Sequence, residues 1–166
     1  MKVRAYIGLG ANLGEGRRNL LAAWQRLGRV AGVTTVRLSR PYRSAPLGVV
    51  SEHWFTNAVG EIETELEAGQ LLGVLLEIER QMGRDRRRQG SDRPIDLDLL
   101  LYGAEIISRP RLEVPHPQMS KRLFVLEPLK ELAPGLVHPG RRLTIAELAA
   151  RLALEDPGQR IIPESW

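Results

Sequence analysis

The segment RPIDLDLLLY, which begins at Arg93, carries two aspartates one residue apart, Asp96 and Asp98. The alternation predicts a strand over residues 95–102, in which both carboxylates lie on one face, with Cα atoms roughly 6.5 Å apart. The opposite face carries Ile95, Leu97, Leu99 and Leu101. Neighbouring carboxylates raise each other's pKa unless a cation lies between them. Mg²⁺ suits such a pair, because it takes one or two carboxylates, keeps waters and binds substrate phosphates. A solvent-facing strand edge is the alternative interpretation.

A cluster of arginines precedes the aspartates within one short loop: Arg84, Arg86, Arg87, Arg88 and Arg93. Cations beside metal ligands indicate a polyphosphate substrate, because phosphoryl and diphosphoryl transfer depend on positioning and charge neutralisation. No GxxxxGK phosphate loop occurs, so ATP would be held by the arginines and the metal. The cluster predicts an enzyme that transfers part of a nucleoside triphosphate.

The glycine-rich stretch near the N-terminus offers a competing interpretation. Gly8, Gly10 and Gly14 follow a predicted strand and precede a predicted helix, as in a dinucleotide-binding loop, and Arg37 could lie near a ribose phosphate. Against this, the strand at residues 33–38 runs into a long loop instead of a crossover helix. A two-domain dehydrogenase also does not fit in this length.

The composition of the 166 residues restricts the class of protein. A hydrophobic fraction of 43% suits one compact domain, residues 1–166, and the absence of cysteine favours a reducing compartment, so we expect a cytoplasmic protein. No run of eighteen apolar residues occurs, so no membrane span is expected. The net charge of +4 comes mainly from arginine, which grips phosphate bidentately, although codon preference or a heat-adapted surface would explain the overall bias equally well.

The hydrophobic periodicity predicts the elements that position these residues. Strands are expected at residues 3–9, 33–38, 55–62 and 95–102, helices at residues 17–30 and 67–82, and a short return strand at residues 105–108. The order βαββαβ predicts an α+β fold, a ferredoxin-like antiparallel sheet with both helices on one face. Additional helices are expected in the C-terminal region.

Four stretches, AYIGLGANLG, YRSAPLG, RPIDLDLLLYG and VPHPQMSKRLFVLEPL, together resemble the 6-hydroxymethyl-7,8-dihydropterin pyrophosphokinase family of folate biosynthesis. The resemblance runs nearly from end to end. It implies a Mg²⁺-dependent transfer of the diphosphate of ATP to the hydroxymethyl oxygen of a reduced pterin, with release of AMP. Asp96 and Asp98 would hold two Mg²⁺ ions.

The resemblance also assigns further residues. Those implied as catalytic are Arg84, Arg93, Asp96 and Asp98. Those implied to bind ATP are Glu79, Arg84, Arg86, Arg93, Leu99, Arg111, Glu113, His116 and Arg122, with Arg86 on a mobile loop. Those implied to bind the pterin are Ser44, Ala45, Pro46, Leu47, Phe55, Asn57 and Phe124. Stacking between two rings and an amide that donates and accepts would suit a flat heterocycle. His116 is expected to contact phosphate rather than act as a base.

The sequence departs from the family pattern at three places. Gly90, Ser91 and Asp92 stand where many relatives carry Trp-Gly-Pro, Ala45 replaces a frequent proline, and Pro117 replaces a tyrosine found in some relatives. These differences concern loop closure and affinity rather than the reaction.

An RNA-binding domain of similar topology is the remaining alternative. It is disfavoured because the RNP1 consensus is missing and the arginines cluster in a loop rather than on a sheet face. We therefore expect ATP and a reduced pterin as partners, neither nucleic acid nor membrane, and a monomer.

Overall fold

A computed structural model describes residues 1–47, 53–85 and 92–166. Arg86, Arg87 and Arg88 of the arginine loop, and Gly90 and Ser91 after it, lie outside the described residues.

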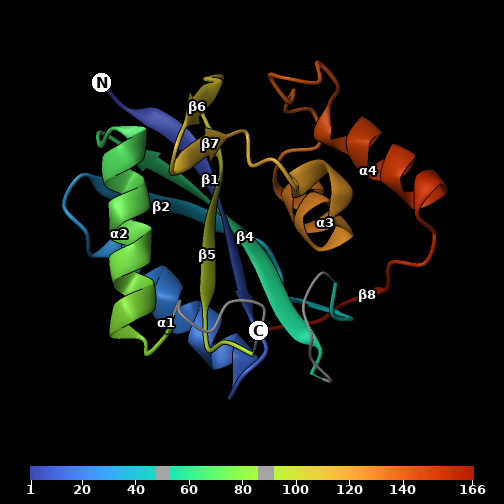
Figure 1. Ribbon diagram of the computed structural model, residues 1–166, viewed down its shortest axis with the longest axis horizontal. Coiled ribbons are helices and arrows are strands. Elements are labelled where there is room, and N and C mark those ends of the chain that lie inside the picture. Colours follow the sequence, from blue (N-terminus) through green and yellow to red (C-terminus); the bar gives the residue numbers. More distant parts are fainter. Residues whose placement is uncertain (48–52, 86–91) are drawn as a thin grey trace.

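An antiparallel sheet forms the centre of the molecule (Figure 1). Its strands are β1 (Val3–Ala11), β2 (Val33–Leu38), β3 (Tyr42–Ser44), β4 (Phe55–Thr64), β5 (Asp96–Tyr102) and β8 (Ile161–Pro163). They follow the order β5-β1-β4-β3-β8, and β2 pairs with β4 as well. Because β1 pairs with both β4 and β5, the N-terminal strand lies inside the sheet, next to the strand that carries the aspartates.

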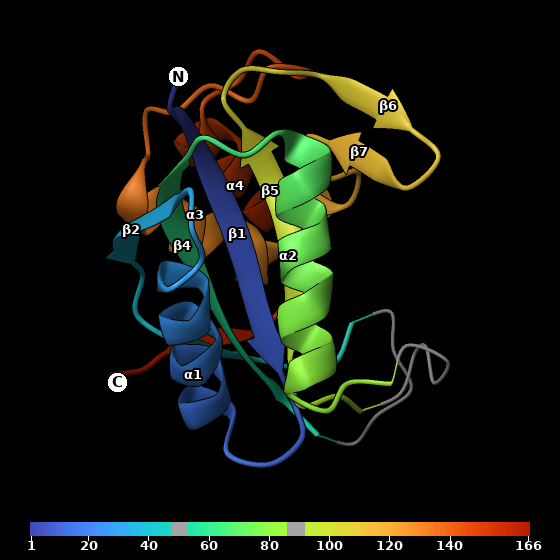
Figure 2. The ribbon, with the colours of Figure 1, turned by 90° about the vertical axis from the view of Figure 1, so that its left-hand side faces the viewer.

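Helices cover both faces of the sheet. α1 (Gly16–Gly28) and α2 (Ala68–Gln81) lie on one face, as Figure 2 shows, and share a core with Ile7 and Leu97. α3 (Leu123–Leu132) and α4 (Ile145–Glu155) lie on the opposite face, after the short 3₁₀ turn η2 (Met119–Lys121), around Tyr6 and Leu100. The predicted mixed architecture with an antiparallel sheet is confirmed, and so are the helices near residues 17–30 and 67–82.

The sequence of α2 explains its limits. Leu71, Leu75 and Ile78 are buried on one side of the helix. Glu67 and Gln70 form a capping box at its start, which satisfies backbone N–H groups that have no partner inside the helix. Gly83, with φ of +91°, follows the last turn in a backbone conformation that favours glycine. This end places Arg84 beside the first residues of β5.

Strand β5 departs from simple alternation. Tyr6 pairs with Leu101 and Ile7 with Leu99, so a bulge leaves Leu100 as an extra residue. Leu100 and Leu101 therefore both belong to the core around α3 and α4, whereas Ile95, Leu97 and Leu99 belong to the core under α1 and α2. The prediction that Leu101 shares a face with Leu99 is wrong, because one inserted residue reverses the side on which all later residues lie.

Short strands outside the predicted set complete the fold. The chain after Gly103 does not return along β5: β6 (Ile107–Arg109) begins two residues later than expected and pairs with β7 (Leu112–Val114) in a separate hairpin. β3 lies within YRSAPLG, where a loop was expected, and β8 pairs with it. In the described part of the chain, no helix combines the length and the apolarity needed to cross a bilayer.

Candidate functional site

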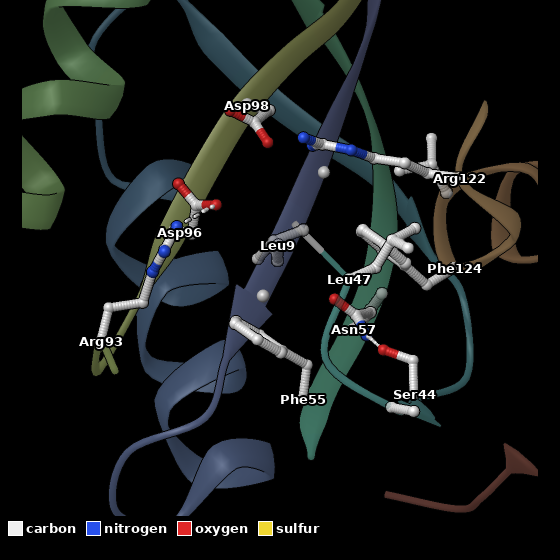
Figure 3. Close-up of a pocket in the computed structure, with 15 residues that line it drawn as sticks. Leu9, Ser44, Leu47, Phe55, Asn57, Arg93, Asp96, Asp98, Arg122 and Phe124 are labelled. Carbon is white, nitrogen blue, oxygen red and sulfur yellow. Dashed lines mark hydrogen bonds and ion pairs between the residues drawn. The ribbon is translucent and has the colours of Figure 1, made fainter. Parts of the chain in front are cut away.

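A cleft opens on the sheet face that carries α3, at the end of β1 where β5, β4 and the segment after β3 meet (Figure 3). Of the residues proposed from the sequence, the following line it: Ser44, Ala45, Leu47, Phe55, Asn57, Arg93, Asp96, Asp98, Arg122 and Phe124. Gly8, Leu9, Gly10, Ala58 and Val125 complete the lining. The fold thus joins residues from Gly8 to Val125, which lie 117 positions apart in the sequence.

Two glycines of β1 form the floor of the cleft. Gly10 pairs with Asp96 and Gly8 with Asp98, so bare backbone lies beside each carboxylate. A Cβ atom on Gly10 would lie 3.0 Å from Oδ1 of Asn57, which is a tight contact. Because Gly8 and Gly10 lie inside a strand instead of in a turn that leads to a helix, the fold does not support a dinucleotide-binding loop.

Asp96 is held by cations from two directions. Nη1 of Arg84 contacts Oδ1 of Asp96, and Nη1 of Arg93 lies 3.4 Å from Oδ2. Nη1 of Arg84 also lies 3.0 Å from Oε2 of Glu79, which accepts a 2.6 Å hydrogen bond from the backbone N–H of Leu97. The Glu79 side chain is only 1% exposed. Glu79 therefore lies behind the cleft, where it orients Arg84 and β5.

Arg93 is fixed through its backbone by Asn12. Oδ1 of Asn12 accepts from the N–H of Arg93 at 2.8 Å, and the N–H of Asn12 donates to the Arg93 carbonyl at 3.1 Å. The Asn12 side chain also donates to Asp92 at 2.9 Å. The guanidinium of Arg93 lies over the Phe55 ring, 5.8 Å from its centroid. Sequence reasoning missed Asn12; its place among the glycines of GANLG was the available signal.

Asp98 is a carboxyl group with a strongly raised pKa. Burial, together with the charge of Asp96, raises the pKa of Asp98 to about 7. No group of three or more His, Cys, Asp or Glu residues that could hold a metal occurs within residues 1–47, 53–85 and 92–166. The paired carboxylates nevertheless fit Mg²⁺, which needs few protein ligands when waters and phosphates complete its octahedron.

His116 faces Asp98 as a neutral side chain. Its Nε2 lies 3.8 Å from Oδ1 of Asp98, which is beyond hydrogen-bond distance. Burial and, secondly, the charge of Arg122 lower the pKa of His116 to about 4. The backbone N–H of Gln118 donates to Nδ1 at 3.2 Å, so the proton of the neutral ring is on Nε2. His116 can therefore donate a hydrogen bond into the site, but it does not form an ion pair with Asp98.

The other side of the cleft has hydrogen-bonding and aromatic groups. Asn57 is 4% exposed, and its Nδ2 donates to Oγ of Ser44 at 2.7 Å. Phe55 and Phe124 lie near this amide in Figure 3. The guanidinium of Arg122 stands over the Phe124 ring at 5.7 Å, so α3 begins with a cation and an aromatic ring directed at the same cleft. A flat heterocycle with donors and acceptors on its edge fits this arrangement.

The remaining predicted residues lie outside the cleft lining. Arg111 is in the β6–β7 turn and Glu113 on β7, and both are exposed. The Leu99 side chain is in the core under α2, and Pro46 lines a neighbouring cavity. Their predicted nucleotide and pterin contacts stay predictions, as do the phosphate contacts of Arg84 and His116.

Comparisons with known proteins show a similarity to one enzyme family. The sequence model described as 7,8-dihydro-6-hydroxymethylpterin-pyrophosphokinase (HPPK) matches residues 6–134. The chain is 42% identical to the 2-amino-4-hydroxy-6-hydroxymethyldihydropteridine pyrophosphokinase of Methylorubrum extorquens, covering 90% of this chain and 93% of the relative. It is also 42% identical to the protein of that name from Haemophilus influenzae, covering 91% and 94%.

A solved structure shares the fold. Wild-type Plasmodium falciparum HPPK-DHPS with pteroate superposes with a TM-score of 0.76 over 93% of this chain at 14% sequence identity, a likeness that concerns the fold alone. The present chain spans only 43% of the length of that solved chain.

Proposed function

Because the chain belongs to the 7,8-dihydro-6-hydroxymethylpterin-pyrophosphokinase family, we propose that Asp96 and Asp98 hold two Mg²⁺ ions for the reaction that it catalyses. That reaction is the transfer of the diphosphate of ATP to the hydroxymethyl group of 6-hydroxymethyl-7,8-dihydropterin, a step of folate biosynthesis. The single observation that carries the proposal is that one cleft is lined by the two carboxylates, by arginines, and by the Asn57 amide with two phenylalanine rings.

The charged residues of the cleft, on β5 and at the start of α3, would bind the triphosphate. Bound Mg²⁺ would neutralise phosphate charge and orient the β-phosphorus. Arg93 and Arg122 line the same cleft and would contact phosphate oxygens, as arginine does bidentately. Neutral His116 would donate a hydrogen bond from its Nε2–H to a phosphate oxygen and would not act as a base, since a group with a pKa of about 4 is a weak base. Arg84, held by Glu79, would keep Asp96 in place.

The residues on the β3 side would bind the acceptor. Asn57, oriented by Ser44, would recognise the pterin edge, and Phe55 and Phe124 would stack on its faces. The hydroxymethyl oxygen would then form a bond to the β-phosphorus while the bond from that phosphorus to the oxygen of the α-phosphate breaks. AMP leaves with the bridging oxygen, and the hydroxyl proton passes to water. The chain supplies position and charge rather than a covalent intermediate.

The topology of the sheet and the state of the whole protein are part of the proposal. The antiparallel order β5-β1-β4-β2 around α1 and α2 supports a ferredoxin-like topology to which β3, β8, α3 and α4 are added. We also propose that residues 1–166 form a single domain that acts as a monomer in the cytoplasm. The sheet shared by both cores supports a single domain, and the absence of cysteine supports a reducing compartment such as the cytoplasm.

The test is to incubate the protein with ATP, Mg²⁺ and the reduced hydroxymethylpterin and to separate the nucleotides. We expect AMP and the pterin diphosphate in equal amounts, and none of either when a chelator removes the metal. Formation of ADP, or no turnover, would contradict the reaction. A Mn²⁺ titration with an ATP analogue that resists cleavage between the α- and β-phosphates should give two bound ions per chain, and one ion would contradict the two-ion site.

A further inference from the structure

The segment between α4 and β8 reaches both walls of the cleft, although it follows residue 134, where the match to the family model ends. Ile161 pairs with Ser44, and the carbonyl of Arg160 accepts from the N–H of Ala45 at 3.3 Å. The side chain of Gln159 contacts the start of α3 instead. Residues 159–161 thus connect the side of the cleft formed by β3, which carries Ser44, to the side formed by the start of α3, which carries Phe124.

Gln159 binds the backbone on both sides of Arg122. Its Oε1 accepts from the N–H of Leu123 at 2.8 Å, and its Nε2 donates to the carbonyl of Lys121 at 2.7 Å. The Nε2 also donates to Oδ2 of Asp156 at 3.0 Å, which fixes the orientation of the amide. Arg122 lies between these two bonds in an extended conformation, with φ of −123° and ψ of 107°.

These bonds replace a cap that α3 lacks. The first N–H groups of a helix have no partner inside it, and the N-cap side chain usually accepts from one of them. Arg122 occupies the N-cap position of α3 and makes no such bond, because a guanidinium has no acceptor. Gln159 supplies the acceptor from 36 residues away. The Arg122 side chain remains directed at the cleft, where Figure 3 shows it pointing toward Asp98.

A second cavity adjoins the cleft beside residues 159–161. It is lined by Ser44, Ala45, Pro46, Leu47, Phe124, Asp156, Gly158, Gln159, Arg160 and Ile161. Leu47 and Phe124 border both this cavity and the cleft. Residues 159–161 link the segment of Ser44 and Ala45 to the start of α3 beside this cavity.

We propose that Gln159 is a positioning residue that aligns Arg122 for the nucleotide and Phe124 for the pterin. This inference rests on the proposed function of the cleft. Gln159 touches neither substrate and acts through the backbone of Lys121 and Leu123. Its loss should weaken the binding of both substrates, which lie on different sides of the cleft.

The experiment compares Gln159→Ala with Gln25→Ala, which removes an exposed glutamine from α1 on the other face of the sheet. Dissociation constants are measured separately for the uncleavable ATP analogue with Mg²⁺ and for the pterin, well below the unfolding temperature. We expect Gln159→Ala to raise both constants about three- to tenfold, as expected for lost hydrogen bonds of ordinary strength. Gln25→Ala should leave both unchanged.

Double variants separate positioning from a general loss of structure. If Gln159 acts through its neighbours, its substitution should no longer change analogue affinity in an Arg122→Ala background, nor pterin affinity in a Phe124→Ala background. Additive effects in both backgrounds would overturn the proposal. Gln159→Glu keeps an acceptor for Leu123 but loses the donor to Lys121 and places a carboxylate beside the exposed Asp156, so it should weaken analogue binding. Unchanged binding in that variant would also count against the proposal.

The wild-type protein distinguishes the function of the cleft from the role of Gln159. A wild-type protein that binds neither substrate would overturn the proposed function and this inference together. A wild-type protein that makes AMP, with Gln159→Ala indistinguishable from Gln25→Ala, would overturn the positioning role alone.

Discussion

Removal of the Glu79 carboxylate should destabilise the protein far more than removal of its neighbour Glu77 on the same helix. Oε2 of Glu79 satisfies both the guanidinium of Arg84 and the backbone N–H of Leu97, and the side chain is 1% exposed. Glu79→Ala leaves that amide without its acceptor, which costs ~1 kcal/mol at the lower end of the usual range. Loss of one partner of a buried ion pair lowers the free energy of unfolding by ~3 kcal/mol. This is the lower end of the usual range, because Arg84 still pairs with Asp96.

The expected loss is therefore ~4 kcal/mol of the free energy of unfolding, which for a urea slope of ~2 kcal/mol per M moves the midpoint down by ~2 M. Glu79→Gln keeps an oxygen for Leu97 and loses only the charged partner of Arg84. It should cost ~2 kcal/mol, or ~1 M in midpoint.

Urea unfolding followed by circular dichroism measures these shifts. Glu77→Ala is the matched control, because Glu77 is half exposed and its pair with Arg80 is a surface pair. Its midpoint should stay close to that of the wild-type protein. If Glu79→Ala and Glu77→Ala unfold at the same urea concentration, Glu79 does not hold β5 and Arg84 in the way described.

Three further predictions concern the cleft. Asp96→Ala and Asp98→Ala should each abolish AMP formation, but only Asp96→Ala should lower the urea midpoint, because Asp96 pairs with two largely buried arginines. Equal midpoints of the two variants would contradict this. Since the pKa of Asp98 is raised from 3.8 to about 7, the folded protein without metal holds a proton that the unfolded chain has released. The contribution of Asp98 to the free energy of unfolding should therefore decrease as the pH rises from about 4 to about 7, whereas His116, with its pKa lowered to about 4, contributes a slope of opposite sign, so Asp98→Asn is compared with the wild-type protein. Saturating Mg²⁺ at pH 8 should restore the stability that is lost when Asp98 releases its proton. Asp98→Asn should remove the contribution of Asp98, so a pH dependence of stability equal to that of the wild-type protein would refute the raised pKa of Asp98. Gly10→Ala should raise the pterin dissociation constant about tenfold, or ~1.4 kcal/mol, through its 3.0 Å contact with Asn57. Gly8→Ala, whose Cβ would meet the flexible Leu100 side chain at 3.4 Å, should have the smaller effect, and calorimetric titration distinguishes the two.

Periodicity and local chemistry predicted the parts of the fold that depend on neighbouring residues. Alternation along β5 correctly separated Asp96 from Leu97, and the stripe from Leu71 to Ile78 located α2 within a residue at each end. The pairing of β1 with β5 then placed Gly8 and Gly10 beside the aspartates, where sequence reasoning had considered a turn. Such local patterns carry no information on which strands become neighbours.

Contacts that span long stretches of sequence were not predictable in this way. Asn12 binds Arg93 across 81 positions, and Gln159 binds Leu123 across 36. An asparagine or glutamine with no charged or periodic context resembles an ordinary surface residue in the sequence. The bulge at Leu100 was hidden for a different reason: a run of leucines is compatible with burial on either face, so the inserted residue left no mark in the pattern.

The order in which the cleft's parts occur along the chain has a consequence for protein synthesis. Among these parts β1 is synthesised first, and its partner β5 follows about 90 residues later. Gln159, which binds the start of α3, is synthesised later still. On the ribosome, one edge of β1 therefore stays without its partner until β5 emerges, and exposed strand edges promote association between chains. Nascent chains stalled before residue 95 should consequently depend on chaperones, whereas chains released after residue 159 can close the sheet and the cleft together.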